Sequence, residues 1–148
     1  MNNRFLSRGK RKDNGEWVTG YYVFQRKRSG VFGQKISELD FDRHLIIDLR
    51  GNSHEVIPET VVRCTGLKDK NGKPIFEGDI LKFVNDDREI SLYVVIWNTS
   101  LLSWQVQEIS HYVKNDYCGF DELCEFGNTE VIGNIHDNPE LLQRSDEE

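Results

Sequence analysis

Residues 80–109 read ILKFVNDDREISLYVVIWNTSLLSWQVQEI and contain three largely apolar runs separated by two short polar segments. The middle run, residues 90–97, is rich in the β-branched and aromatic side chains that suit a pleated strand. The Asn, Asp, Ser and Thr residues of the connecting segments favour tight turns. The stretch therefore predicts three strands joined by turns, at residues 80–84, 90–97 and 104–109.

The same alternation of strand and turn residues continues on both sides of this stretch. Residues 4–10 and 16–24 are extended candidates, and Asn14-Gly15 between them favours a β-hairpin. Near the C-terminus, a strand at 131–135 precedes Asn138-Pro139-Glu140, which predicts a capped, short C-terminal helix. The pattern predicts a mainly β protein, either a small β-barrel or a sandwich. The residues expected in its core are Val23, Ile47, Ile75, Phe76, Ile80, Leu81, Phe83, Val94, Ile96, Trp104, Val106, Val131 and Ile135.

The composition describes an acidic, soluble globular chain. Of its 148 residues 37% are hydrophobic and 30% charged, and the net charge is −6. No run approaches the roughly 18 apolar residues of a transmembrane helix, and the N-terminus lacks the apolar core of a secretory signal. Three cysteines are too few for a disulfide scaffold. We therefore expect a cytoplasmic protein that does not contact a membrane.

Charge is distributed unevenly along the chain. Residues 1–30 contain eight Lys or Arg against two acids, whereas residues 84–148 contain three against fourteen. The basic residues could face water beside turns, bind nucleic acid, or meet the acidic surface of another copy. The candidate nucleic-acid contacts are Arg8, Lys10, Arg11, Lys12 and Trp17, since cations beside an aromatic ring can hold a single strand. The acidic net charge disfavours nucleic acid, and packing within the hairpin explains the same residues.

The most distinctive motif is TGLKDKNGKPIFEGDI, residues 65–80. The spacing of Gly66 and Gly72, with Pro74 after Lys73, excludes a phosphate-binding P-loop. Lys73 and Pro74 also occupy positions where an EF-hand loop needs a calcium ligand and a glycine. The motif instead predicts structural turns. The residues expected to form them are Gly66, Asn71, Gly72, Gly78 and Asp79.

The sequence contains no recognisable catalytic or metal-binding pattern. A zinc site could be formed only by residues far apart in the sequence, namely His111, Cys118, Cys124 and His136. These residues do not form the closely spaced pairs that are typical of structural zinc sites. No nucleophile elbow is present in the sequence. The acids of residues 116–125 could act as an acid–base pair, but a loop of solvated carboxylates has the same sequence pattern. We expect a protein that is not an enzyme and has no cofactor or metal; the role of the His and Cys residues stays open.

Three stretches together resemble the YopX family, which consists of small proteins of bacterial phages and prophages. They are residues 4–11 with 14–21, residues 59–61 with 65–80, and residues 130–142. The resemblance implies one β-rich domain over residues 1–148, with an N-terminal hairpin subdomain at about 1–60 and an SH3-like barrel at about 61–148. It also implies self-association as a homo-oligomer, and it supplies no reaction, cofactor or catalytic residue. We expect a non-enzymatic accessory protein that binds a phage or host protein or self-assembles; nucleic-acid binding is the alternative.

Overall fold

A computed structural model of the 148-residue chain describes residues 3–26, 42–113, 120–122 and 128–146. The chain divides into two compact units, Phe5–Arg63 and Cys64–Glu148, and residues Met1–Arg4 are grouped with the second. Antiparallel strands dominate both units, which confirms the expected mainly β protein.

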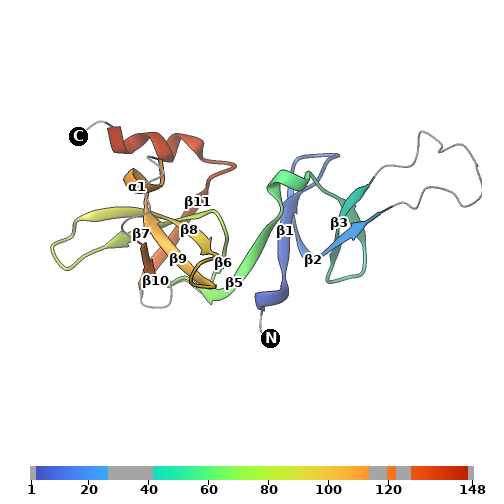
Figure 1. Ribbon diagram of the computed structural model, residues 1–148, viewed down its shortest axis with the longest axis horizontal. Coiled ribbons are helices and arrows are strands. Elements are labelled where there is room, and N and C mark those ends of the chain that lie inside the picture. Colours follow the sequence, from blue (N-terminus) through green and yellow to red (C-terminus); the bar gives the residue numbers. More distant parts are fainter. Residues whose placement is uncertain (1–2, 27–41, 114–119, 123–127, 147–148) are drawn as a thin grey trace, which may run out of the picture. The chain divides into compact units, whose positions relative to one another are not determined.

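The N-terminal unit is a ladder of antiparallel strands (Figure 1). The expected hairpin is confirmed: its two strands pair with Lys10 opposite Trp17, and Gly15 in the connecting turn has a φ of 71°. The strands are β1 (Ser7–Lys10), β2 (Trp17–Gln25), β3 (Arg43–Asp48), β4 (Ser53–Glu55) and the first two residues of β5 (Val62–Lys68), with the short 3-10 helix η2 (Pro58–Thr60). Another 3-10 helix, η1 (Asn3–Phe5), precedes β1. The strands lie in the order β4-β3-β2-β1-β5, and β5 continues into the C-terminal unit.

The core of the N-terminal unit contains Ile46, Val56 and Val62. The prediction that Val23 is a core residue is wrong. Ile47 is only half-buried, and Val23 keeps 36% of its surface exposed. The three consecutive apolar residues at 45–47 do not identify the inward face by themselves, and the pairing of β3 with β2 and β4 turns Ile46 inward.

The C-terminal unit is built on a five-stranded antiparallel sheet. Its elements are β6 (Pro74–Phe76), β7 (Asp79–Val84), β8 (Ile90–Asn98), β9 (Ser103–Glu108), α1 (Ile109–Val113), β10 (Phe120–Glu122), β11 (Thr129–Asn134) and the 3-10 helix η4 (Pro139–Asp146). The sheet has the order β10-β9-β8-β7-β11, and β6 pairs with β5 instead. The three expected strands at 80–109 are thus confirmed as adjacent strands.

The expected barrel is not found in the part of the chain that the structure describes. The edge strands β10 and β11 each have one neighbour, so the sheet remains open. Alternation along a strand specifies which side chains face the core, whereas closure depends on the pairing of the first and last strands, which alternation does not encode.

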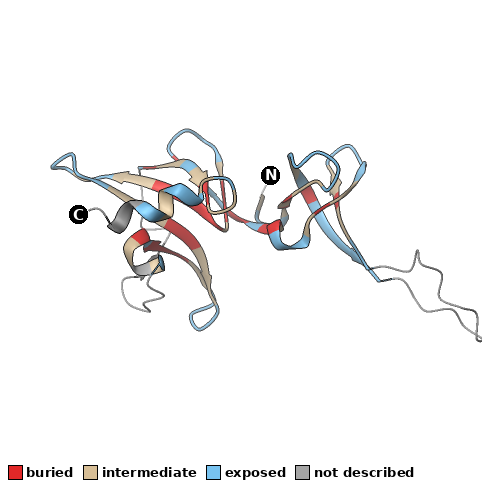
Figure 2. Cartoon of the chain, turned by 90° about the horizontal axis from the view of Figure 1, so that it is seen from above, coloured by how far each residue is buried: buried red, intermediate tan, exposed pale blue. Residues whose placement is uncertain are grey.

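Two clusters of buried side chains form the core of this unit. One contains Ile75, Leu81, Val95 and Val106, and the other contains Ile80, Val94 and Ile109. Figure 2 shows the buried residues of the chain in red. Six expected core residues are buried, namely Ile75, Phe76, Ile80, Leu81, Val94 and Val106. The other expected core residues of this unit are half-buried: Phe83, Ile96, Trp104, Val131 and Ile135.

The C-terminal helix is confirmed, but its cap differs from the expectation. The Asn138 side chain does not cap the following turn; its Oδ1 accepts a hydrogen bond from the Asn134 backbone N–H at 3.2 Å. The backbone carbonyl of Asn138 accepts a hydrogen bond from the Leu141 N–H at 3.1 Å. This bond joins residues three positions apart, as in a 3-10 helix. Leu141 and Leu142 pack against the cluster around Ile80. No helix in the described segments has the length and apolar character needed to span a membrane.

Candidate functional site

The distinctive motif of residues 65–80 is organised around the buried side chain of Asp69. Its Oδ1 accepts hydrogen bonds from the backbone N–H groups of Asn71 and Lys73, at 2.9 and 2.8 Å. Its Oδ2 accepts from the backbone N–H of Val131 at 3.0 Å. Burial raises the pKa of this carboxyl, but the three N–H donors and the charge of Lys73 outweigh burial and hold the pKa below its ordinary value. Asp69 therefore joins the β5–β6 turn to edge strand β11.

The glycines of the motif occupy left-handed backbone conformations. Gly66, Gly72 and Gly78 have φ values of 85°, 80° and 81°, which glycine adopts without the steric cost of a Cβ. Gly78 also donates its N–H to the Val95 carbonyl at 2.8 Å. The fully buried Asp79 accepts the Phe76 N–H on its Oδ2 at 2.8 Å. These hydrogen bonds join the turns to the neighbouring strands.

Arg8, Lys10 and Trp17 form a cation–aromatic stack in the N-terminal unit. Arg8 and Lys10 project from the half-exposed face of β1, whereas Ser7 and Gly9 between and beside them are buried. The Arg8 Cζ lies 4.7 Å from the centroid of the Trp17 ring, and the Lys10 Nζ lies 5.5 Å from it. At these distances the ring attracts both cations, so the structure brings three of the predicted contact residues together.

Arg11 and Lys12, the other two predicted contacts, form ion pairs in and beside the β1–β2 turn. The Arg11 guanidinium donates to both carboxylate oxygens of Asp13, with Nε to Oδ1 at 3.0 Å. The Lys12 Nζ lies 3.1 Å from the Glu55 Oε1. These two cations are therefore compensated by acids of their own unit.

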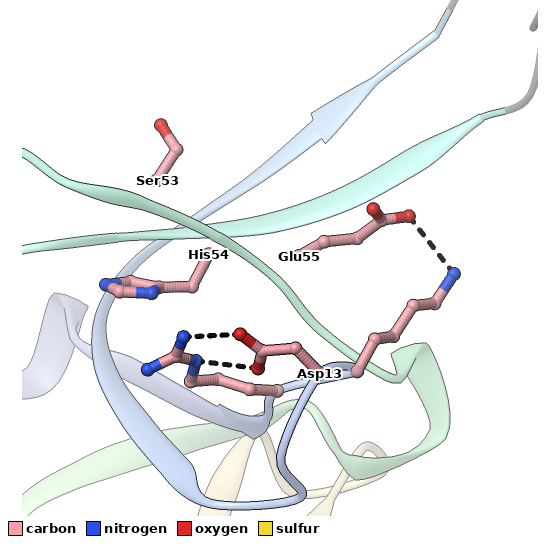
Figure 3. A pocket seen from close by; sticks show the side chains of 6 residues that line it. Asp13, Ser53, His54 and Glu55 are labelled. Atoms are coloured by element: carbon pink, nitrogen blue, oxygen red, sulfur yellow. Dashed lines mark hydrogen bonds and ion pairs between the residues drawn. The ribbon is translucent and has the colours of Figure 1, made fainter.

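A polar pocket of about 290 Å³ lies beside this turn (Figure 3). Its lining residues are Arg11, Lys12, Asp13, Ser53, His54 and Glu55. Both carboxylates of the lining form ion pairs, Asp13 with Arg11 and Glu55 with Lys12. A guanidinium nitrogen of Arg43 also lies 3.6 Å from the Glu55 Oε2. The pocket therefore offers no uncompensated charge among its lining acids and bases for an ionic ligand.

One ring nitrogen of His54 already forms a hydrogen bond within the chain. Its Nε2 lies 2.8 Å from the Asp48 Oδ2, while the Asp48 Oδ1 accepts the backbone N–H groups of Arg50 and Asn52. The hydrogen bond with the His54 side chain is the largest contribution to a lowered pKa of Asp48, which is about 2. The hydrogen bond from the Asn52 backbone N–H is the next largest contribution that lowers it. The His54–Asp48 pair therefore fastens the β3–β4 turn, which sequence reasoning did not anticipate.

In the described part of the N-terminal unit, the far half of β2 contains four consecutive exposed apolar or aromatic residues (Figure 2). Tyr21, Tyr22, Val23 and Phe24 are 47%, 40%, 36% and 44% exposed. On one face, the Tyr22 hydroxyl lies 2.6 Å from the His44 Nδ1, and the Phe24 ring centroid lies 4.9 Å from that of His44. This surface, Tyr21–Phe24 with His44 on β3, is called the aromatic ribbon below.

The comparison with protein families finds a family that covers most of the chain. The family model described as YopX protein matches residues 8–143. The chain belongs to the YopX family. The match spans the Arg8–Trp17 stack, the aromatic ribbon and the Asp69 turn. No curated protein matches this YopX chain.

Some predicted candidates of this YopX chain lie outside the described residues. They are Cys118 and Cys124, together with the side chain of His111 and the basic residues Lys27 and Arg28. His136 is described and its N–H donates to the Asn134 Oδ1 at 3.0 Å. Among the residues that the structure does describe, no three His, Cys, Asp or Glu side chains gather in a way that could hold a metal ion.

Proposed function

We propose that this YopX-family chain is a non-enzymatic accessory protein of a phage or prophage that acts by binding proteins, including copies of itself. The observation that carries the proposal is the aromatic ribbon, whose apolar side chains at Tyr21–Phe24 are each more than a third exposed. Contiguous exposed apolar surface of this kind is typical of protein-binding sites. The charge-compensated pocket supports a function that does not involve catalysis.

Sedimentation equilibrium at low and high salt tests this proposal. We expect a mass above that of the monomer, and a smaller mass at high salt if the basic and acidic surfaces contribute. Replacing Tyr22 and Phe24 by Ser should lower the mass, because it removes apolar area from the ribbon. The matched control replaces Leu101 and Leu102, which are 65% and 72% exposed in the β8–β9 turn. A wild-type protein that is monomeric at both salt concentrations contradicts the proposal.

Nucleic-acid binding remains the second candidate, and the Arg8–Trp17–Lys10 stack is the observation that favours it. Single-stranded nucleic acid binds where cations line an aromatic surface. Fluorescence titration with a single-stranded oligonucleotide tests this, since Trp17 itself reports contact. The variant with Arg8 and Lys10 both changed to Gln should bind more weakly and reduce the slope of log K against log salt by about 1.4. Arg50→Gln, at an exposed turn position, is the control; salt-independent binding would exclude this function.

Two further parts of the proposal concern location and fold. We propose a cytoplasmic protein, supported by the sparse cysteines of the sequence. The SH3-like character that the resemblance implies for residues 61–148 also stays a prediction. Superposition of an experimental structure on SH3-type domains tests it, and a different strand order would contradict it.

A further inference from the structure

We propose that β2 pairs edge to edge with β2 of a second copy, antiparallel and centred on Val23, to form a two-fold symmetric dimer with one continuous sheet. This inference rests on the proposed protein-binding function and names its partner. The segment involved is Tyr21–Gln25, called the open edge below.

The pairing of β2 leaves the open edge without a neighbour on one side. β1 pairs with β2 only over Trp17–Gly20, whereas β3 pairs with it from Gly20 to Gln25. Along Tyr21–Gln25, no second strand is paired to β2 within the described residues. Alternate backbone N–H and C=O groups of an edge strand face outward and can pair with another strand.

The terminal strands of the two described sheets are protected. β4, β6 and β10 have three residues each, and short edge strands pair poorly with other chains. β11 is longer, but it has a bulge between Val131 and Gly133. The β5–β6 turn also covers β11, because Lys70 donates its N–H to the Thr129 carbonyl at 2.9 Å and Asp69 accepts from Val131.

The open edge has none of these protections. Its five residues read YYVFQ and contain no proline, no glycine and no charge. It pairs with β3 without a register shift from Gly20 to Gln25. A regular, exposed and uncharged edge of apolar residues is the form that accepts an added strand.

A second copy fits this edge because the segment is complementary to itself. With Val23 on the two-fold axis, Tyr22 lies opposite Phe24 of the other copy, and Tyr21 lies opposite its Gln25. No like charges meet, and aromatic cross-strand pairs stabilise a sheet. A symmetric dimer needs this self-complementarity, since one surface must bind its own copy.

Sedimentation velocity of Val23→Lys tests the inference. The substitution puts two cations opposite each other on the axis, so we expect a wild-type dimer and a monomeric variant. The matched control is Leu49→Lys, which adds the same charge at a 68% exposed position in the same unit and should remain dimeric. Circular dichroism should show that both variants keep their β-sheet.

Cross-linking of Val23→Cys provides a second measurement that does not depend on disrupting the contact. Residues opposite each other have Cβ atoms roughly 4.5–5.5 Å apart, so a small movement brings two thiols to disulfide distance. Mild oxidation should give a covalent dimer for Val23→Cys and not for the wild type or Leu49→Cys.

The outcomes separate this inference from the proposed function. If Val23→Lys remains a folded dimer, or Val23→Cys cross-links no faster than Leu49→Cys, the edge pairing is wrong while self-assembly stands. If the wild type is monomeric throughout, both the inference and the proposed self-assembly fail.

Discussion

The replacement of Asp69 by Asn tests the central contact of the motif at residues 65–80. Asparagine keeps the shape of the side chain, and its carbonyl oxygen can still accept from Asn71 and Lys73 in the place of Oδ1. Its NH₂ group then replaces Oδ2 and faces the N–H of Val131, so two donors oppose each other. The variant should lose the link between the turn and β11 while retaining the turn itself.

The magnitude follows from the number and type of hydrogen bonds lost. A hydrogen bond to a charged group contributes about 1.5–3 kcal/mol, so Asp69→Asn should destabilise the C-terminal unit by about 2 kcal/mol. Asp69→Ala loses all three bonds and should cost about 4 kcal/mol. It should not cost much more, because Asn71 and Lys73 are exposed and their N–H groups can bond to water.

Urea unfolding monitored by tryptophan fluorescence measures these changes. Trp97 and Trp104 lie in the C-terminal unit with ring centroids 5.1 Å apart, so a Trp17→Phe background restricts the signal to that unit. The control is Asp87→Asn, the same chemical change in an exposed turn, with an expected effect below about 0.5 kcal/mol. If Asp69→Asn is as stable as this control, the carboxylate does not hold β11.

The same variant should change the pH dependence of stability. The pKa of Asp69 is lowered in the folded protein below its ordinary value of 3.8, so the stabilisation is complete above that pH and is lost as pH falls through the folded-state pKa. Asp69→Asn cannot titrate and should show a flatter loss of stability in acid. Equal slopes for variant and wild type below about pH 4 would refute the assignment.

Three further predictions concern other positions. Gly20→Ala should destabilise the N-terminal unit by more than about 3 kcal/mol, since a Cβ there would lie 2.0 Å from the Ile47 carbonyl oxygen; urea unfolding followed by Trp17, with Trp97 and Trp104 changed to Phe, measures this, and a change below about 1 kcal/mol contradicts it. Asp48→Asn should reduce the acid sensitivity of the same signal between pH 3.8 and about 2, because hydrogen bonds from His54 and the Asn52 N–H lower the Asp48 pKa; an unchanged acid profile contradicts this. Leu102→Asn should raise the melting temperature of the C-terminal unit, by about 0.5–1 kcal/mol in stability, since Leu102 has a φ of 51° and is 72% exposed; calorimetry would show no gain if the turn is unstrained.

Local features of the sequence predicted the elements that depend on local chemistry. Asn14-Gly15 predicted the β1–β2 hairpin, and the β-branched run at 90–97 predicted β8. Pro139 and Glu140 predicted the C-terminal helix. In each case the turn or strand preference belongs to neighbouring residues and needs no distant contact to act.

Features that depend on pairing between distant residues were missed. The hydrogen bond from the Val131 N–H to the Asp69 side chain joins residues that are 62 positions apart in the sequence. An Asp in a polar turn does not by itself predict such a contact. Gly20 has an ordinary strand context, although the close approach of the Ile47 carbonyl leaves no room for a side chain. The choice of Ile46 over Ile47 as the buried residue likewise follows from register with neighbouring strands.

The uneven treatment of sheet edges connects the structural motif to the proposed function. At β11 the chain provides a bulge, a covering turn and a buried carboxylate, which together prevent pairing with another chain. At Tyr21–Gln25 it leaves a regular, uncharged edge, although one Lys or Pro would protect it. An exposed edge of this kind promotes aggregation unless a specific strand occupies it. The proposed β2–β2 pairing accounts for both observations: the 65–80 motif covers one edge, and the proposed second copy occupies the open edge of β2.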